Sequence, residues 1–127
     1  IGDKFNLPWN YQLPVEKKYK DLSWAEQPQT INEVGSTFTI QGFDLNYCGV
    51  ILGPSIKFRN GKIVYDRTKS YDRQVTDKRT MKNGEQQDIS ELIRNQLNVL
   101  LKRGVHGLFL YAVDDELRKE LLRQTKR

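Results

Sequence analysis

Hydrophobic and polar positions change their spacing within the stretch 34–53. Residues 37–40 alternate polar and apolar, as in a strand with one buried face, whereas residues 50–52 are all apolar, as in a strand covered on both faces. This pattern predicts two strands of different burial joined by the polar loop 41–44. Since ligands in open α/β sheets bind outside the carboxyl ends of the strands, we expect the functional residues to gather at that loop.

A β-hairpin is predicted after these strands. The pair Asn60-Gly61 separates two short alternating runs, 57–59 and 62–65. An Asn-Gly pair is the strongest short-range hairpin signal, because a type I′ turn needs positive φ at both central positions. Residues 66–84 contain few apolar side chains and are expected to form a mobile loop.

Two helices and one further strand are predicted in the last third of the chain. Asp88, with Glu91 three residues on, suits the cap at the start of a helix. The apolar residues that follow recur at helical spacing, which predicts the helix itself. We expect Gly104 to end this helix in a left-handed conformation. The apolar run 107–113 predicts a buried strand, and the acidic residues 114–116 start a last helix.

The order of these elements predicts an α/β fold. Strand, helix, strand and helix in sequence imply a parallel sheet flanked by helices, with the hairpin as an insertion. Residues 1–30 are rich in aromatics and prolines and are expected to form an irregular lead-in wrapped on the core. The domain itself is then 31–127, with 57–84 as its basic hairpin and loop insertion. Trp9 and Trp24 are expected to pack, with stacking on nucleic-acid bases as the alternative.

Composition limits the classes of protein to which the chain can belong. Its 127 residues, 37% of them hydrophobic, suffice for one domain with a core. The single cysteine, Cys48, predicts no disulfide framework and a reducing compartment, which we take to be the cytoplasm. No apolar run approaches the roughly 18 residues of a membrane span, so no membrane association is expected. Because the chain starts at Ile1 without a methionine, we expect a fragment of a longer protein.

Positive charge is concentrated in one stretch. The net charge is +5, and residues 57–82 contain nine basic against three acidic residues, so the remainder is about neutral. Such clustering is typical of surfaces that bind nucleic acid, and a solvated loop with interspersed charge is the alternative. The candidate nucleic-acid-binding residues are Lys57, Arg59, Lys62, Arg67, Lys69 and Arg73.

The chain lacks the motifs of a free-standing enzyme. It contains no Gly-x-x-x-x-Gly-Lys-Ser/Thr loop for nucleotide phosphates, and the lone His106 excludes a histidine-based metal site. Three aspartates in the stretch 66–77 would suit a metal-dependent nuclease, but they lie in a net-basic loop without a partner Glu or His. We therefore expect no metal or cofactor to bind this chain alone.

Two stretches resemble motifs of a known protein family. Residues 35–44, Gly-Ser-Thr-Phe-Thr-Ile-Gln-Gly-Phe-Asp, resemble motif V of superfamily 1 DNA/RNA helicases, and residues 95–104, Asn-Gln-Leu-Asn-Val-Leu-Leu-Lys-Arg-Gly, resemble their motif VI. With Pro8-Trp9-Asn10 upstream, these motifs are most similar to the bacterial Schlafen-like helicase family, formerly a domain of unknown function. The resemblance implies the C-terminal part of the second RecA-like domain, of the P-loop NTPase type. A first RecA-like domain with the Walker A and B motifs would precede it.

The resemblance also implies roles for individual residues. Arg103 matches the arginine finger, which reaches the γ-phosphate of an ATP held mainly by the first RecA-like domain. ATP and Mg²⁺ are thereby implied for the full-length protein, with single-stranded DNA or RNA as its partner. Motif V couples nucleotide state to contacts with the nucleic-acid strand, and the residues that match it are Thr39, Gln41, Gly42 and Asp44.

Two functions stay open at this point. One is a motor fragment of an ATP-hydrolysing helicase or translocase, inactive by itself. The other is a non-catalytic module, with a degenerate RecA-like fold, that binds nucleic acid or protein. From the residues alone, Arg103 is better explained as a cation that complements the dipole at a helix C-terminus, and only the family resemblance favours the arginine finger. Likewise, Gly42 suits a plain turn, and Thr39 suits an outward position on a strand.

Overall fold

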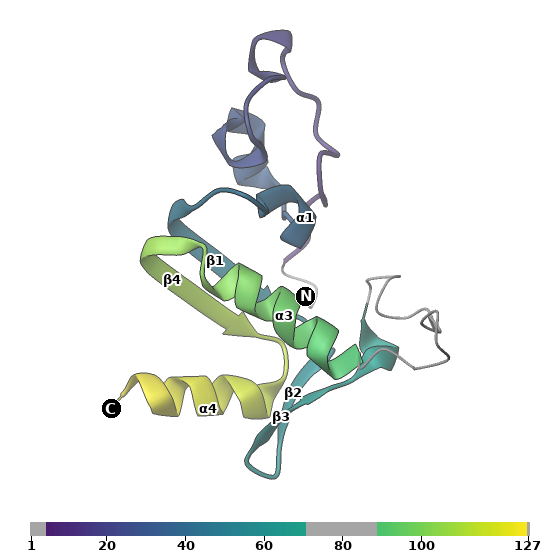
Figure 1. Cartoon of the computed structure of the whole chain (residues 1–127), viewed down its shortest axis with the longest axis vertical. Helices are drawn as coiled ribbons and strands as arrows, with labels where there is room; N and C mark the ends of the chain where they lie inside the picture. Colours follow the sequence, from purple (N-terminus) through teal and green to yellow (C-terminus); the bar gives the residue numbers. More distant parts are fainter. Residues whose placement is uncertain (1–4, 71–88, 127) are drawn as a thin grey trace.

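The computed structural model describes residues 5–70 and 89–126 of the chain. Its elements run from short 3₁₀ turns at the N-terminal end to a strand and a helix at the C-terminal end (Figure 1). In chain order they are η1 (Lys17–Tyr19), η2 (Trp24–Glu26), η3 (Pro28–Asn32), α1 (Thr37–Ile40), β1 (Leu45–Leu52), β2 (Ile56–Arg59), β3 (Lys62–Tyr65), η4 (Arg67–Lys69), α3 (Ile89–Leu101), β4 (Gly104–Ala112) and α4 (Asp115–Thr125). Most of the expected loop 66–84 lies outside the described residues, as does Arg73, a candidate nucleic-acid-binding residue.

A parallel pair of strands forms the centre of the fold. β1 and β4 pair in parallel, with Cys48 opposite Leu108 and Leu52 opposite Ala112. Between them the chain runs through the hairpin and then through α3, which covers one face of the pair (Figure 1). This arrangement confirms the predicted α/β class, with a small parallel sheet, helices and an inserted hairpin. The core consists of Cys48, Val50, Leu52, Ile56, Ile93, Leu97, Ala112 and Leu117.

The hairpin has the predicted turn. β2 and β3 pair antiparallel with Arg59 opposite Lys62, which leaves Asn60 and Gly61 as the two turn residues. Their φ angles are 52° and 76°, as a type I′ turn requires. The hairpin forms a two-stranded sheet of its own and does not join β1 and β4. It is fixed to the rest of the fold by the buried Ile56 and by contacts with α4.

The prediction of a strand at residues 37–40 is wrong. These residues form α1, one turn of helix capped by Ser36, whose side chain accepts a hydrogen bond from the Phe38 amide. Alternation over four residues fits either a strand or one turn of helix, and here the capping hydrogen bonds decide the conformation. Loop 41–44 consequently precedes β1, the first strand of the sheet, and does not follow a strand.

The prediction of a left-handed helix cap at Gly104 is also wrong. Among the described glycines, Gly42 and Gly61 have positive φ and Gly104 does not; it is the first residue of β4. A Cβ atom at Gly104 would collide with the carbonyl oxygen of Gly107. This residue is therefore required by close backbone approach and not by its φ angle.

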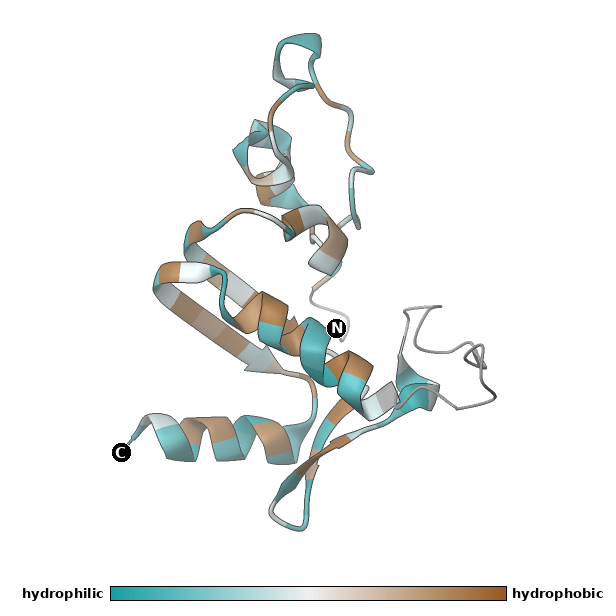
Figure 2. Cartoon of the chain, in the orientation of Figure 1, coloured by the Kyte–Doolittle hydropathy of each residue, from teal (hydrophilic) through white to brown (hydrophobic). Residues whose placement is uncertain are grey.

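β4 is less buried than its apolar sequence predicts. Only one face of the β1–β4 pair is covered by α3, and β4 is coloured as hydrophobic along most of its length in Figure 2. On the opposite face, which we call the open face, the side chains of Tyr47, Phe109 and Tyr111 are exposed. The prediction of a buried strand is thus wrong for β4 within the described part of the chain.

The last helix begins where the acidic residues predict. Asp114 caps α4 by accepting a hydrogen bond from the Leu117 amide, and Leu117 itself is buried in the core. Acidic residues in the first turn and Arg123 in the last turn also complement the helix dipole. None of the helices within residues 5–70 and 89–126 is long and apolar enough to cross a membrane.

Candidate functional site at the amino ends of β1 and β4

The two motif-like stretches meet at Arg103. The Nε atom of Arg103 donates to the carbonyl oxygen of Val99 at 3.2 Å, and its Nη1 atom donates to the carbonyl oxygen of Phe43 at 3.3 Å. Nη1 also lies 3.6 Å from Oδ1 of Asp44. The side chain is 21% exposed. Arg103 thus connects the end of α3 to loop 41–44, and its side chain remains partly exposed.

Backbone pairing holds the same two stretches together. The Leu45 amide, at the start of β1, donates to the carbonyl oxygen of Arg103 at 2.8 Å. Leu45 and Gly104 are partners in the parallel register, so loop 41–44 and the α3–β4 connection lie at one edge of the sheet. This edge is formed by the amino ends of the strands. The expectation that loop 41–44 would follow the carboxyl end of a strand is wrong, because residues 37–40 are helical and the loop comes before β1.

The predicted motif V residues differ in their surroundings. Gln41 and Gly42 are exposed, and the carboxylate of Asp44 is 67% exposed. Gly42 has φ 96° with no atom within 4 Å of the place of a Cβ, so its conformation alone favours glycine. Thr39 is buried, and its hydroxyl lies 2.8 Å from the carbonyl oxygen of Ser36. Thr39 therefore acts within the cap of α1.

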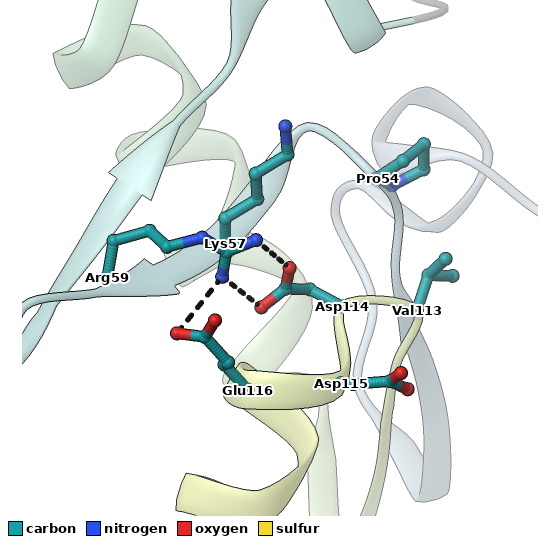
Figure 3. A pocket seen from close by; sticks show the side chains of 7 residues that line it. All are labelled: Pro54, Lys57, Arg59, Val113, Asp114, Asp115 and Glu116. Carbon is teal, nitrogen blue, oxygen red and sulfur yellow. Dashed lines mark hydrogen bonds and ion pairs between the residues drawn. The ribbon is translucent and has the colours of Figure 1, made fainter.

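Two of the predicted nucleic-acid-binding cations are engaged in ion pairs. Nζ of Lys57 lies 2.6 Å from Asp66, and this pairing is the main reason that the pKa of Asp66 is lowered to about 2. Arg59 makes a bidentate pair with Asp114, at 2.7 and 2.9 Å, and also approaches Glu116 at 3.5 Å (Figure 3). The bonds from Arg59 hold the pKa of Asp114 well below its usual range. The charges of Lys57 and Arg59 are thus compensated within the fold.

The other predicted cations are less constrained. Lys62 and Lys69 are exposed, and Arg67 is half-buried with an interaction of its own. Lys57 and Arg59 line an open hollow at the carboxyl ends of the strands, together with Pro54 and the stretch 113–116 (Figure 3). β1 has eight residues and separates this hollow from Arg103 by roughly 25 Å, since a strand rises about 3.3 Å per residue. The predicted catalytic residue and the basic hairpin therefore lie at opposite ends of the sheet.

The described part of the chain offers no metal site. No group of three or more His, Cys, Asp and Glu side chains within residues 5–70 and 89–126 is arranged to hold an ion. The acidic residues around Arg59 serve to join the hairpin to the start of α4. The charged side chains around the hollow of Figure 3 thus have a structural role, and we assign the hollow no ligand.

Sequence reasoning missed one residue that contacts the start of α1, the helix before loop 41–44. The side chain of Asn10 binds Ser36 and reaches Thr39, at the start of α1. Asn10 has φ 45°, a conformation that asparagine adopts more readily than most residues. In the sequence, Asn10 stood out only as part of the Pro8-Trp9-Asn10 run. Its contact with Ser36 was not predictable, because a contact between residues 26 positions apart leaves no periodic pattern.

Comparison with known proteins gave two matches. Residues 1–114 match the family described as "Schlafen group 3, DNA/RNA helicase domain". The chain is also 45% identical over 130 residues to "Uncharacterized protein YPL245W" from Saccharomyces cerevisiae, covering 99% of this chain and 27% of that relative. The chain therefore spans about a quarter of the relative's length, and the relative is from a yeast, so a bacterial placement stays a prediction. No solved structure matches the chain.

Proposed function

Because this chain belongs to the Schlafen group 3 DNA/RNA helicase domain family, we propose that it is the C-terminal part of the second RecA-like domain of an ATP-dependent helicase or translocase. ATP and Mg²⁺ would be held mainly by a first RecA-like domain in the same longer protein. In this proposal the chain supplies the arginine finger and the loop that couples the state of the nucleotide to a strand of DNA or RNA.

The observation that carries the proposal is the contact of Arg103 with loop 41–44. Direct contact between a residue that senses ATP and a loop that senses nucleic acid gives each a physical route by which to affect the other. Here Arg103 donates to the Phe43 carbonyl oxygen and approaches Asp44, so a movement of the guanidinium changes contacts of the loop directly. Residues 60 positions apart in the sequence are thereby linked by one side chain.

The present contacts of Arg103 suit a side chain that changes partner. It donates to two neutral carbonyl oxygens, and the exposed Asp44 lies beyond ordinary hydrogen-bond distance at 3.6 Å. A phosphate group carries full negative charge and can accept two parallel bonds from one guanidinium, whereas each carbonyl oxygen is neutral and accepts a single bond here. A γ-phosphate at this edge would therefore compete well for the guanidinium, which would stabilise the charge of the transferring phosphoryl group.

A non-catalytic module is the second candidate. It is favoured by the bond from Nε of Arg103 to Val99, because this carbonyl group belongs to the last turns of α3. A cation in that place stabilises the helix by about 0.3–1 kcal/mol without any ligand. The two functions are separated by whether Arg103 affects turnover or only stability.

The test is to replace Arg103 in the longer natural protein that carries this sequence. If Arg103 is an arginine finger, Arg103→Ala and Arg103→Lys lower ATP turnover by about 10³-fold and change ATP binding far less, because the contact strengthens as charge develops in the transition state. Lysine does not rescue because a compact ammonium cannot replace the planar fork. Steady-state ATPase rates and melting temperatures are measured together.

Arg94→Ala is the matched control. Arg94 lies on the exposed side of α3, where it pairs with Glu91 within the same helix. We expect this variant to keep normal turnover. Near-normal turnover in Arg103→Lys, or in Arg103→Ala with a lowered melting temperature, would overturn the finger assignment and support the module.

A further inference from the structure

A tight turn at the N-terminal end packs against the start of α1. Trp9 and Val34 form a parallel bridge, in which the Asn10 amide donates to the Val34 carbonyl oxygen at 3.0 Å and the Val34 amide donates to Pro8 at 2.9 Å. Asn10 and Tyr11 have φ angles of 45° and 53°. Two successive positive φ angles in residues other than glycine cost free energy, so the surroundings must stabilise this turn.

The side chain of Asn10 is directed at the cap of α1. Its Oδ1 atom accepts from the Ser36 amide at 2.9 Å, and its Nδ2 atom donates to the Ser36 hydroxyl at 3.1 Å. Oδ1 also lies 3.3 Å from the hydroxyl of Thr39, which can donate either there or to the Ser36 carbonyl oxygen. One amide group therefore contacts both residues that form the cap.

α1 depends on these contacts because it is short. A helix of four residues has no stability of its own, since nucleation of one turn is unfavourable. Its conformation is set by the cap at Ser36 and by the burial of Ile40 at its other end. The next residues are loop 41–44, which contacts Arg103. The position of the cap therefore determines where this loop begins.

A second anchor fixes the turn from which Asn10 projects. The buried carboxylate of Glu33 accepts from the amides of Tyr11 and Leu13, at 3.2 and 2.5 Å, and from the indole Nε1 of Trp24 at 3.0 Å. Burial raises the pKa of Glu33, but these bonds outweigh burial and the pKa lies below its ordinary value. A Cβ atom at Gly35 would lie 3.0 Å from the Trp24 ring. The turn, Trp24 and the start of α1 are thus packed closely.

From these contacts we propose that Asn10 is a positioning residue for loop 41–44. It holds the cap of α1, and through α1 it fixes the beginning of loop 41–44, whose other end is held by the pairing of Leu45 with Arg103. This inference rests on the proposed function, because the purpose of a fixed loop is the coupling described above. The Pro8-Trp9-Asn10 run is then an outlying part of the same functional unit as Arg103, although it lies more than ninety residues away in the sequence.

The first arm of the test measures the loop itself. Hydrogen exchange of the amides in 36–44 is followed by mass spectrometry in the longer natural protein, for the parent, Asn10→Ala and Asn10→Asp. We expect Asn10→Ala to exchange about tenfold faster in this stretch. Asn10→Asp keeps an acceptor for the Ser36 amide and hydroxyl, so it should restore most of the protection and also covers the case in which Asn10→Ala fails to fold.

The second arm measures turnover. Asn10→Ala is expected to lower kcat for ATP hydrolysis by about 10- to 100-fold with little change in KM for ATP, because a misplacement of about 1 Å can cost about 10²-fold. Ser23→Ala is the matched control, since the Ser23 hydroxyl donates to Glu26 at the cap of the nearby turn η2, whereas the bonds to Ser36 at the cap of α1 come from Asn10. It should lower the melting temperature and leave kcat unchanged.

The two arms fail in different ways. Unchanged exchange in 36–44 for Asn10→Ala, or a fall in kcat no larger than that of Ser23→Ala, would overturn the positioning role. Normal turnover in Arg103→Ala would instead overturn the proposed function, and exchange alone would then decide whether Asn10 holds the loop. Faster exchange together with lower kcat, both restored by Asn10→Asp, would support the inference.

Discussion

Asp114 joins β2 to α4 through a single carboxylate. It accepts from the Leu117 amide in α4, from the Phe58 amide in β2 and from both terminal nitrogens of Arg59. Its side chain is only 9% exposed, whereas that of Arg59 is 42% exposed. A buried acceptor with four donors is costly to remove, because its partners then lose their bonds without regaining full contact with water.

We expect Asp114→Ala to lower the free energy of unfolding by about 2 kcal/mol. Loss of an N-cap costs about 1 kcal/mol, and the half-exposed ion pair adds less than a buried one would. Chemical denaturation of the two proteins measures the difference. Asp115→Ala serves as control, since Asp115 is exposed and pairs with Arg118 within the same helix. Equal losses in the two variants would contradict the central place of Asp114.

At the scale of elements, the sequence predicts those whose signal is local. The turn at Asn60-Gly61, the helix after Asp88 and the start of α4 at Asp114 all depend on nearby residues, and all three are present. Residues 37–40 were misread because their conformation depends on Asn10 and on the Ser36 cap. The meeting of Arg103 with loop 41–44 was predictable only through the family resemblance, since no local pattern joins residues 60 positions apart.

The hairpin turn allows a direct test of backbone conformation. Gly61 has φ 76° with open space around the place of a Cβ, so Gly61→Ala adds strain without any collision. We expect a loss of about 1 kcal/mol in the free energy of unfolding. Gly53→Ala is the matched control, because Gly53 also has open space but no positive φ. A loss at Gly61 no larger than at Gly53 would show that the turn adapts.

At the scale of the whole molecule, the basic hairpin and the open face lie in different places. The basic hairpin lies at the carboxyl ends of the strands, and the open face with Tyr47, Phe109 and Tyr111 lies between the two ends. Parallel sheets are normally covered on both faces. The apolar run in β4 is typical of a strand covered on both faces. An apolar run carries no information about which residues would cover the second face, so the exposure of the open face was not predictable from the sequence.

Contact of the hairpin with a nucleic-acid backbone predicts a salt dependence. Lys62 and Lys69 are exposed, so we expect the double variant Lys62→Ala/Lys69→Ala to bind single-stranded oligonucleotides more weakly. If each lysine contacts one phosphate, the slope of log K against log salt falls by about 1.4 in magnitude. Fluorescence anisotropy at several salt concentrations measures this slope, with the exposed Lys119→Ala in α4 as control. An unchanged slope would exclude the two lysines from the interface.

The burial of Cys48 gives the protein a reporter of its own. Cys48 is the single cysteine of the chain, is 4% exposed on the covered face of β1, and burial raises the pKa of its thiol. Because the thiolate is the reactive form, a thiol reagent modifies this side chain only when the core opens. The rate of labelling under native conditions therefore follows the population of open molecules. A variant that disturbs only loop 41–44 would label at the parent rate, and a variant that loosens the core would label faster.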